Sequence, residues 1–312
     1  MAPARPLIAE ELGPSRWRGQ RHRLEVWYAT FADPTTGDGY WLHHEVVAST
    51  VGEPYAHGWA AVFPAGATPV CERFGPVPVA PDGEAWFRAG DVVVGPGRLW
   101  GSAGDLEWDL RYEDAGPPLF TFPRWAWERE LLPAAQVVPW PTADFEGRFG
   151  GVELGDARGA LARIYGHGNA ERWAWLHADL GDGDVVEVVA AAPRRRGPVA
   201  LPPLPMVQLR VGGRDWPQHP LMAAGLGRAR IGLPRWSATL RSRHRRLTVK
   251  VLVPPEESVS LGYTDPDGAT ATCTNSERAS AQVTLEAYDG GWRTERHWAL
   301  DGTAHAEVGT RP

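Results

Sequence analysis

The chain has 312 residues, of which 43% are hydrophobic and 22% are charged, so its composition is globular and excludes a largely disordered protein. A net charge of −6 and a pI near 5.9 disfavour wholesale binding to nucleic acid. No apolar stretch approaches the roughly 20 residues needed to span a bilayer, so we expect no stable membrane insertion.

The N-terminal residues and the cysteines indicate the cellular location that we expect for the protein. Residues 1–19 contain no apolar segment followed by a cleavage site, so we expect no signal peptide. Cys71 and Cys273 alone do not make a disulfide framework, which suits a reducing environment. We therefore expect a cytoplasmic location.

In chain order, the first predicted element is a β-hairpin. Residues 22–31 and 40–49 alternate between apolar and polar side chains, and a turn rich in Gly and Pro separates them. The same alternation, punctuated by Asp-Gly and Gly-Gly turns every 8–12 residues or so, is typical of sandwiches and barrels. Further strands are predicted within residues 57–66, 86–97, 106–114, 207–213, 235–242, 246–254, 259–268, 269–276, 280–291 and 292–302.

The middle of the chain differs from this pattern. Only residues 125–136 could form a short helix, and Pro133 limits it. The segment from Pro117 to Pro141 contains six prolines and divides the chain near its midpoint. We therefore predict an all-β fold of two antiparallel β-barrel units in tandem, an N-terminal one over residues 1–145 and a C-terminal one over residues 146–312.

Motifs for cofactors and metals are absent from the sequence. It contains no phosphate-binding loop, no dinucleotide-binding glycine pattern, no nucleophile elbow and no zinc-ligand spacing. The adjacent His43 and His44 point to opposite faces of a strand and cannot easily share one metal. We expect chemistry that uses no cofactor and no metal.

A basic run lies between Arg228 and Lys250, with seven arginines, one histidine and one lysine. It fits either a patch that binds anions or a membrane surface, or a solvated strand face. In a chain of overall negative charge, we predict the solvated face.

The central stretch YGHGNAERWAWLHADL, residues 165–180, carries the candidate site. As a strand it places a small apolar series on one face (Ala174, Leu176, Ala178, Leu180) and an aromatic, polar series on the other (Trp173, Trp175, His177, Asp179). The apolar face suits packing on another layer, and the aromatic face is typical of the wall of a ligand pocket. In the alternative interpretation the tryptophans fill a barrel and His177 simply hydrogen-bonds to Asp179.

The Gly-His-rich turn before this W-x-W strand resembles the lipocalin-like superfamily of carotenoid hydratases, tocopherol cyclases and related β-barrel cyclases, including some Diels–Alderases. The opening hairpin over residues 25–47 and the closing stretches CTNSERASAQVTLEAYDGGW and AHAEVGTRP resemble it too. The resemblance implies two lipocalin-like barrels with a hydrophobic cleft within or between them. It also implies a hydrophobic polyene, terpenoid or polyketide-like substrate, and either hydration, acid-initiated ring closure or pericyclic cyclisation.

Such chemistry needs an acid, a base and aromatic walls. A buried carboxyl can stay protonated near neutral pH, indole faces stabilise cationic charge, and imidazole suits proton transfer. Alternatively, hydrogen-bond donors polarise a substrate carbonyl while the walls fold the chain. The candidate catalytic residues are His177, Glu171, Asp179, His167 and Asn169, and the candidate substrate-binding residues are Trp173, Trp175, Tyr165, Trp41 and Trp59.

The expected function is therefore a cofactor-independent cyclase or isomerase, or a hydratase, of secondary metabolism. The alternative is a carrier that binds a hydrophobic small molecule in the same cavity and needs no buried acid. The sequence leaves the oligomeric state open.

Overall fold

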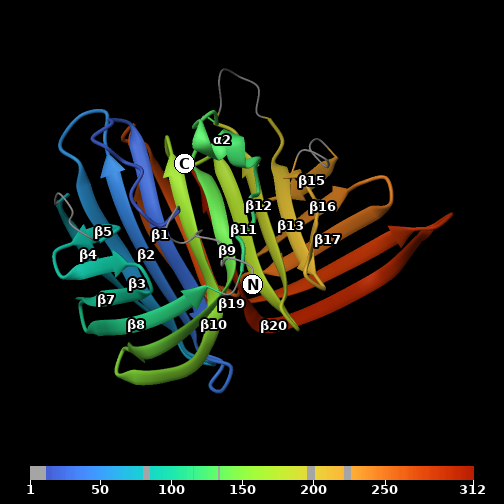
Figure 1. Ribbon diagram of the computed structural model, residues 1–312, viewed down its shortest axis with the longest axis horizontal. Helices are drawn as coiled ribbons and strands as arrows, with labels where there is room; N and C mark the ends of the chain where they lie inside the picture. Colours follow the sequence, from blue (N-terminus) through green and yellow to red (C-terminus); the bar gives the residue numbers. More distant parts are fainter. Residues whose placement is uncertain (1–11, 80–84, 115, 133, 195–200, 221–225) are drawn as a thin grey trace, which may run out of the picture.

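The computed structural model describes residues 12–79, 85–114, 116–132, 134–194, 201–220 and 226–312. Strands make up nearly all of the regular structure, and they form two large antiparallel sheets (Figure 1). The predicted all-β fold with two barrel-like units in tandem is confirmed.

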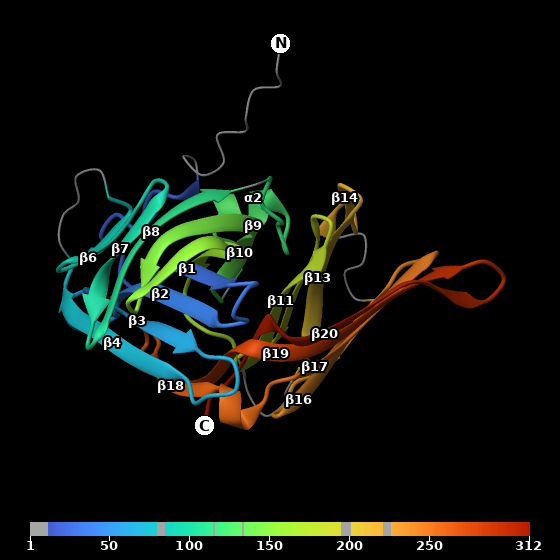
Figure 2. The same ribbon diagram turned by 90° about the horizontal axis from the view of Figure 1, so that it is seen from below.

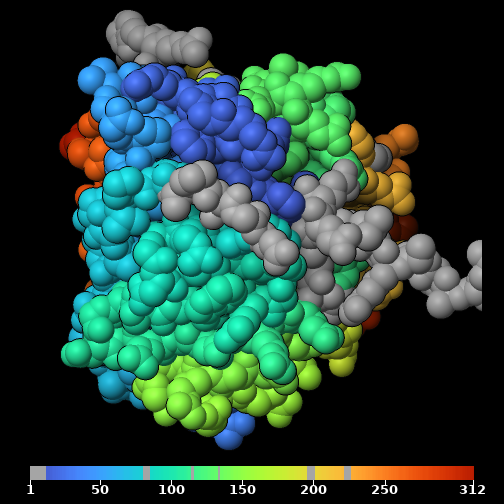
Figure 3. All heavy atoms as spheres, turned by 60° about the vertical axis from the view of Figure 1, so that its left-hand side comes forward, coloured from blue at the N-terminus to red at the C-terminus, as the bar shows by residue number. Residues whose placement is uncertain are grey.

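The first sheet is built from the strands that come first in the chain, in the order β4-β3-β2-β1-β10-β9-β8-β7-β6-β5. Because β5 and β7 also contact β4, the sheet curls into a nearly closed barrel (Figure 2). On the side turned forward in Figure 3, strands β6 to β8 lie beside one another as a continuous surface. The strands are β1 (Arg23–Ala32), β2 (Gly39–Ala48), β3 (Tyr55–Phe63), β4 (Val70–Pro78), β5 (Phe87–Ala89), β6 (Val92–Gly95), β7 (Arg98–Ala103), β8 (Leu106–Asp114), β9 (Gln136–Phe149) and β10 (Val152–Gly166).

The second sheet has the order β14-β13-β12-β11-β20-β19-β17-β16-β15, with β18 paired to β19. Strand β13 contacts β15 and β16, which curls this sheet as well, and the β19–β20 hairpin projects beyond the other strands (Figure 2). The strands are β11 (Arg172–Gly181), β12 (Asp184–Ala192), β13 (Leu204–Val211), β14 (Arg214–Trp216), β15 (Gly227–Arg230), β16 (Arg235–Arg241), β17 (Arg245–Leu252), β18 (Val259–Thr264), β19 (Thr270–Tyr288) and β20 (Trp292–Thr310).

The chain passes from the first sheet to the second over residues 167–171, between β10 and β11. The proline-rich segment lies earlier, inside the first sheet, and β9 runs across residues 145 and 146. Within the predicted helical stretch, α2 (Arg124–Glu128) is a short helix. A 3-10 turn, η2 (Pro255–Glu257), precedes β18.

Two predictions touch residues outside the described part of the chain. These are the absence of a signal peptide, for residues 1–11, and the limiting Pro133. Within the described ranges, no helix combines the length and the apolar character needed to cross a membrane.

Strand alternation produces three separate cores. The interior of the first barrel is filled largely by aromatic side chains, including Trp27, Phe31 and Phe145. The interior of the second sheet is aliphatic, with Trp236 as its one buried indole. A third core lies between the two sheets and joins their facing surfaces. Many of the tryptophans are therefore packing residues, and the third core is the place where the two units meet.

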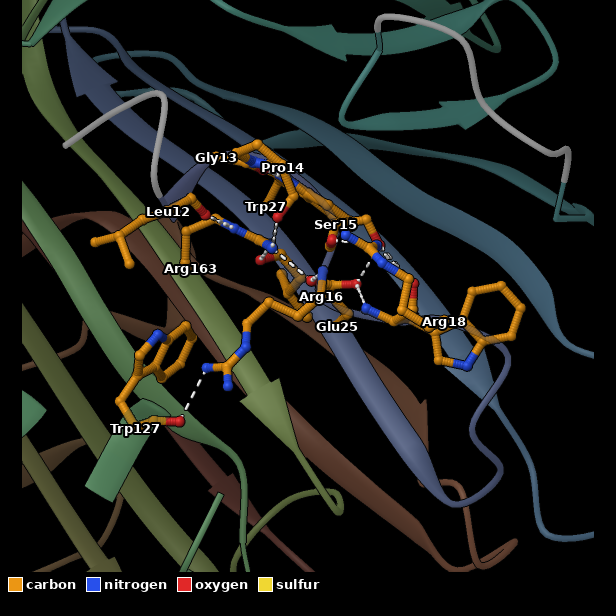
Figure 4. A network of polar contacts seen from close by, with 12 residues as sticks. Leu12, Gly13, Pro14, Ser15, Arg16, Arg18, Glu25, Trp27, Trp127 and Arg163 are labelled. Atoms are coloured by element: carbon orange, nitrogen blue, oxygen red, sulfur yellow. Dashed lines mark hydrogen bonds and ion pairs between the residues drawn. The ribbon is translucent and has the colours of Figure 1, made fainter. Parts of the chain in front are cut away.

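The N-terminal residues 12–18 are held against the first barrel by a buried ion pair (Figure 4). Arg163 on β10 is fully buried and donates to Glu25 Oε1 on β1 at 2.5 Å. It also donates to the carbonyl oxygens of Leu12 at 2.9 Å and Val26 at 2.6 Å. The Glu25 carboxylate in turn accepts hydrogen bonds from residues 15, 16 and 17. This network fixes the segment before β1 to two strands of the barrel.

Candidate active site between the two sheets

The aromatic face of the central strand lies in the core between the sheets. Trp173, Trp175 and His177 are buried there, and the alternate residues Ala174 and Leu176 lie in the core of the second sheet. The predicted alternation of β11 is therefore observed. Its aromatic face packs against the outer surface of the first barrel.

The first barrel contributes Tyr28, Trp41 and Trp59 to this layer. The Tyr28 ring lies 4.9 Å from Trp175 and 5.7 Å from Trp41, between their centroids. Trp41 and Trp59 are stacked at 6.4 Å. Four of the predicted substrate-binding tryptophans thus come together, two from each sheet.

A chain of hydrogen bonds crosses from one sheet to the other at Tyr28. Its hydroxyl lies 2.9 Å from His305 Nε2 on β20, and His305 Nδ1 lies 2.8 Å from Glu277 Oε1 on β19. Thr30 donates to the other oxygen of Glu277, and Asn275 Nδ2 donates to the Tyr28 hydroxyl at 3.3 Å. The arrangement orders a phenol, an imidazole and a carboxylate in one line, which is the geometry of a proton relay.

The electrostatics of this relay favour a protonated phenol next to an imidazole that readily gains a proton. Burial, together with the charges of Glu307 and Glu277, raises the pKa of Tyr28 well above its usual value. Burial by itself lowers the pKa of His305, but the charge and hydrogen bond of Glu277 outweigh it and raise that pKa. The Tyr28 hydroxyl therefore stays protonated, and the group of this chain that more readily carries an extra proton is His305.

A second imidazole–carboxylate pair lies beside the relay. His177 Nδ1 is 2.6 Å from Glu187 Oε1 on β12, and the other oxygen of Glu187 accepts a hydrogen bond from Trp175 Nε1 at 2.8 Å. His177 is directly opposite His305 in the register between β11 and β20. One carboxylate thus orients both the imidazole and the indole of the predicted site.

A third polar group lies on the first-barrel side of the layer. Glu45 Oε2 is 3.3 Å from His43 Nε2 and 3.2 Å from His57 Nε2. Burial by itself raises the pKa of Glu45, but hydrogen bonds from these histidines outweigh it and lower that pKa to about 2. Glu45 is therefore a permanent anion. Among the described residues no group of three His, Cys, Asp or Glu side chains has a geometry suited to a metal ion.

Several buried polar atoms around Tyr28 have no hydrogen-bond partner among the described residues. They are Trp41 Nε1, His43 Nδ1 and Asn275 Oδ1. Buried polar atoms in folded proteins are nearly always paired, because leaving one unpaired costs roughly 1–3 kcal/mol. The hydrogen-bonding capacity of these three atoms beside Tyr28 is therefore unused by the described residues.

The remaining predicted site residues lie elsewhere. Asp179 is exposed and accepts a hydrogen bond from Gly181 N in the turn after β11, so it is not the partner of His177. Tyr165 packs in the core of the first barrel, where the Arg16 guanidinium lies over its ring. Glu171 is half-buried and lines a surface pocket of about 350 Å³ at the start of β11.

The turn between the sheets also has a structural role. His167 lies 3.0 Å from an Arg23 nitrogen and packs edge-on against His22. Asn169 donates from its backbone and its side chain to Asp265, at 2.7 and 3.0 Å. Neither residue faces the aromatic layer with His177. The structure thus separates His167, Asn169, Glu171 and Asp179 from the residues that it gathers around Tyr28.

Sequence reasoning missed the relay and the carboxylates around it. A signal exists in the alternation itself, because Tyr28 and Thr30 share one face of β1, and His305 and Glu307 share one face of β20. Their immediate neighbours are apolar or small, namely Ala29 and Phe31 in β1 and Ala304, Ala306 and Val308 in β20. Buried faces of this kind are costly unless their polar groups are paired. Such strands are therefore candidates for contributing to a site.

His44 points away from this layer, into the first barrel, as predicted from its place next to His43. Its Nδ1 donates to the Trp27 carbonyl at 3.1 Å, and Nε2 is one of the buried atoms without a partner. Burial lowers the pKa of His44 from 6.5 to about 3. The neighbouring His43 lowers this pKa further, and the hydrogen bond to Trp27 only partly opposes the shift.

This shift predicts a loss of stability in mild acid. Between about pH 6.5 and pH 3 the unfolded chain binds a proton at His44 that the folded chain does not, so stability falls as the pH falls, by up to about 1.4 kcal/mol per pH unit. His44→Gln should flatten this slope between pH 6.5 and 4.5, above the range in which Glu45 contributes. Urea denaturation at a series of pH values measures it. The exposed His297→Gln is the control, and an unchanged slope in His44→Gln would show the assignment to be wrong.

The chain is thus a tandem β-barrel protein with a hydrogen-bonded tyrosine, histidine and glutamate in the layer between its two units. Residues 151–310 match the Tocopherol cyclase-like family. Two Mycobacterium tuberculosis proteins, the uncharacterized proteins Rv0493c and MT0513, are each 51% identical over 301 residues, which covers 95% of this chain and 89% of theirs. The chain belongs to the Tocopherol cyclase-like family.

Solved structures share the fold. A protein of Nitrosomonas europaea assigned as AttH superposes with a TM-score of 0.57 at 16% identity, covering 92% of both chains. CghA, solved with Sch210972, gives a TM-score of 0.56 at 14% identity, covering 93% of this chain and 88% of CghA. At these identities the likeness extends to the tandem barrel architecture.

Proposed function

We propose that the protein is a cofactor-independent cyclase or hydratase that acts on a hydrophobic polyene, terpenoid or polyketide-like substrate in secondary metabolism. The observation that carries the proposal is the Tyr28–His305–Glu277 relay, buried between indole rings. Membership of a family named for a cyclase supports the same class of reaction.

The reaction would begin with a proton passing from protonated His305 to the Tyr28 oxygen while the Tyr28 hydroxyl gives its own proton to an alkene carbon of the substrate. The electron pair of the double bond forms the new C–H bond, and the cation is left on the neighbouring carbon. Trp41 and Trp175, whose rings flank Tyr28, would stabilise that cation through their faces. Glu277 would hold His305 in its protonated form before the step, and because the two transfers are coupled no phenolate would form.

The cation then has two fates. In a cyclase, a second double bond or a hydroxyl of the substrate attacks it, and His177 takes the proton that is released. In a hydratase, water attacks and loses its proton to the same base. Glu187 fixes the His177 ring and stabilises the imidazolium, as a buried carboxylate does in catalytic triads. Trp41 Nε1 and His43 Nδ1 would orient a polar group of the substrate.

Mass spectrometry of the products separates the possible outcomes. The protein is incubated with a panel of prenylated phenols, prenylated quinols and linear polyenes, and each mixture is analysed by liquid chromatography with mass detection. A product of unchanged mass and new retention time indicates a cyclase, and a gain of one water indicates a hydratase. Ligands that bind but are recovered unchanged would favour a carrier and contradict the proposal, as would a panel with neither binding nor turnover.

A further inference from the structure

The second sheet carries a strongly basic segment. Residues 226–254 contain eight of the 32 lysines and arginines of the chain and no aspartate or glutamate, although the chain as a whole has a net charge of −6. They form β15, β16 and β17 at one side of the molecule (Figure 1). Positive charge is therefore concentrated on three neighbouring strands.

The alternation of these strands directs the charges outward. In β15 the exposed Arg228 and Arg230 alternate with Ala229, which faces the aliphatic core of the sheet. Arg230 is opposite Ser237, which is opposite Lys250 on β17, so these side chains form one row across the outer face. The face is exposed, as both interpretations of the basic run require.

Most of these charges have no acidic partner. Arg245 and Arg246 pair with Glu295 and Glu286. No ion pair joins Arg228, Arg230 or Lys250 to a carboxylate within the part of the chain that the structure describes, and the same holds for Arg235. Arg230, Arg235 and Lys250 also line a groove of about 660 Å³ on this face, whose lining includes one acidic residue, Asp301.

Exposed leucines flank the same strands. Leu226, immediately before β15, is 57% exposed, and Leu233, in the loop between β15 and β16, is 50% exposed. Leu204 at the start of β13 is 49% exposed and lies close to Leu226, because Pro205 packs closely against Gly227. Large aliphatic side chains in solvent are costly, and a set of them bordering free arginines is typical of a surface that meets a lipid bilayer.

We propose that the outer face of β15–β17, with Leu204, Leu226 and Leu233 at its margins, docks on an anionic phospholipid membrane. The leucines would enter the acyl boundary, and the arginines would lay their aliphatic stems on it and hold lipid phosphates with their guanidinium groups. The leucines favour a bilayer over a nucleic acid, which offers no apolar layer for them. Such docking would bring the protein to a membrane in which hydrophobic molecules dissolve. It can be tested by measuring binding to vesicles, without any catalytic activity.

Co-sedimentation with vesicles tests the docking. The full chain is mixed with vesicles of phosphatidylcholine alone, or of phosphatidylcholine and phosphatidylglycerol in equal parts. We expect binding to the anionic vesicles that weakens with added salt, since screening reduces the attraction. Arg228→Gln/Arg230→Gln/Lys250→Gln should lower the partition coefficient by about a hundredfold, because each cation near an anionic leaflet contributes roughly fivefold.

Two further variants separate docking from simple charge attraction. Leu226→Ser/Leu233→Ser should weaken binding at both low and high salt, because the apolar contribution is not screened. The matched control, Val51→Ser/Arg88→Gln, changes an exposed valine and an exposed arginine of the first barrel and should bind like the unmodified protein. Absence of binding to anionic vesicles, equal binding by all variants, or preferential binding to duplex DNA in the same buffer would each overturn the proposal.

Discussion

Tyr28→Phe is expected to lower turnover by about 10²–10⁴-fold while leaving the protein folded. The substitution removes one oxygen atom, and with it the proton donor and the hydrogen bonds to His305 and Asn275. The ring stays, so its packing against Trp41 and Trp175 is kept. The measurement is the steady-state rate with a substrate identified by product analysis, together with a thermal melt.

The first barrel supplies a matched control for this substitution. Tyr40 is also fully buried, its hydroxyl has no hydrogen-bond partner among the described residues, and its ring stacks on Phe31 away from the relay. Tyr40→Phe should therefore keep full turnover. His305→Gln should reduce turnover as Tyr28→Phe does, because the proton of Tyr28 is then not replaced. Unchanged rates in both Tyr28→Phe and His305→Gln would remove the relay from the mechanism.

Local periodicity predicted the part of the site that lies within one strand. In β11 every second residue faces the layer between the sheets, so Trp173, Trp175 and His177 could be assigned to one face from the sequence. The same rule failed for Asp179. It is exposed and accepts a hydrogen bond from Gly181 N in the turn that follows instead.

The partners of these residues could not be predicted, because they depend on pairing between distant strands. His177 meets His305 only through the register of β11 with β20, more than a hundred residues along the chain. In β19 an irregularity between Ser276 and Ala279 also interrupts the alternation. Cys273 faces the layer between the sheets, whereas Ala279 and Ala281 face the core of the second sheet. A period of two cannot be followed through such a bulge.

The prolines lie near the middle of the chain, but the point at which the chain passes from the first sheet to the second is set by strand pairing. β10 pairs with β1 and so brings the first sheet back to its own beginning. The first barrel can therefore end only after Gly166, whatever the composition of the segment before it. Barrel closure depends on which strands pair, and the proline content of a connecting segment does not reveal that pairing.

Arg163→Met should be among the most destabilising substitutions in the chain, with a loss of about 3–5 kcal/mol in the free energy of unfolding. It leaves the buried Glu25 without its cation. It also removes the donor to the Leu12 carbonyl, which holds the N-terminal segment in Figure 4, and the donor to the Val26 carbonyl on β1. The Arg163 guanidinium also lies 3.9 Å from the centre of the Trp27 ring, so its packing is lost as well.

Urea denaturation of Arg163→Met, Glu25→Gln and the double variant measures whether the two charges stabilise the fold together. The double variant should be less destabilised than the two single losses added together, because a neutral pair leaves no charge unpaired in the barrel. Arg98→Met is the control, since its ion pair with Asp109 is exposed and exposed pairs contribute little. If Arg163→Met unfolds at the same urea concentration as Arg98→Met, the buried pair does not hold the segment. Strict additivity in the double variant would show that the two charges do not act together.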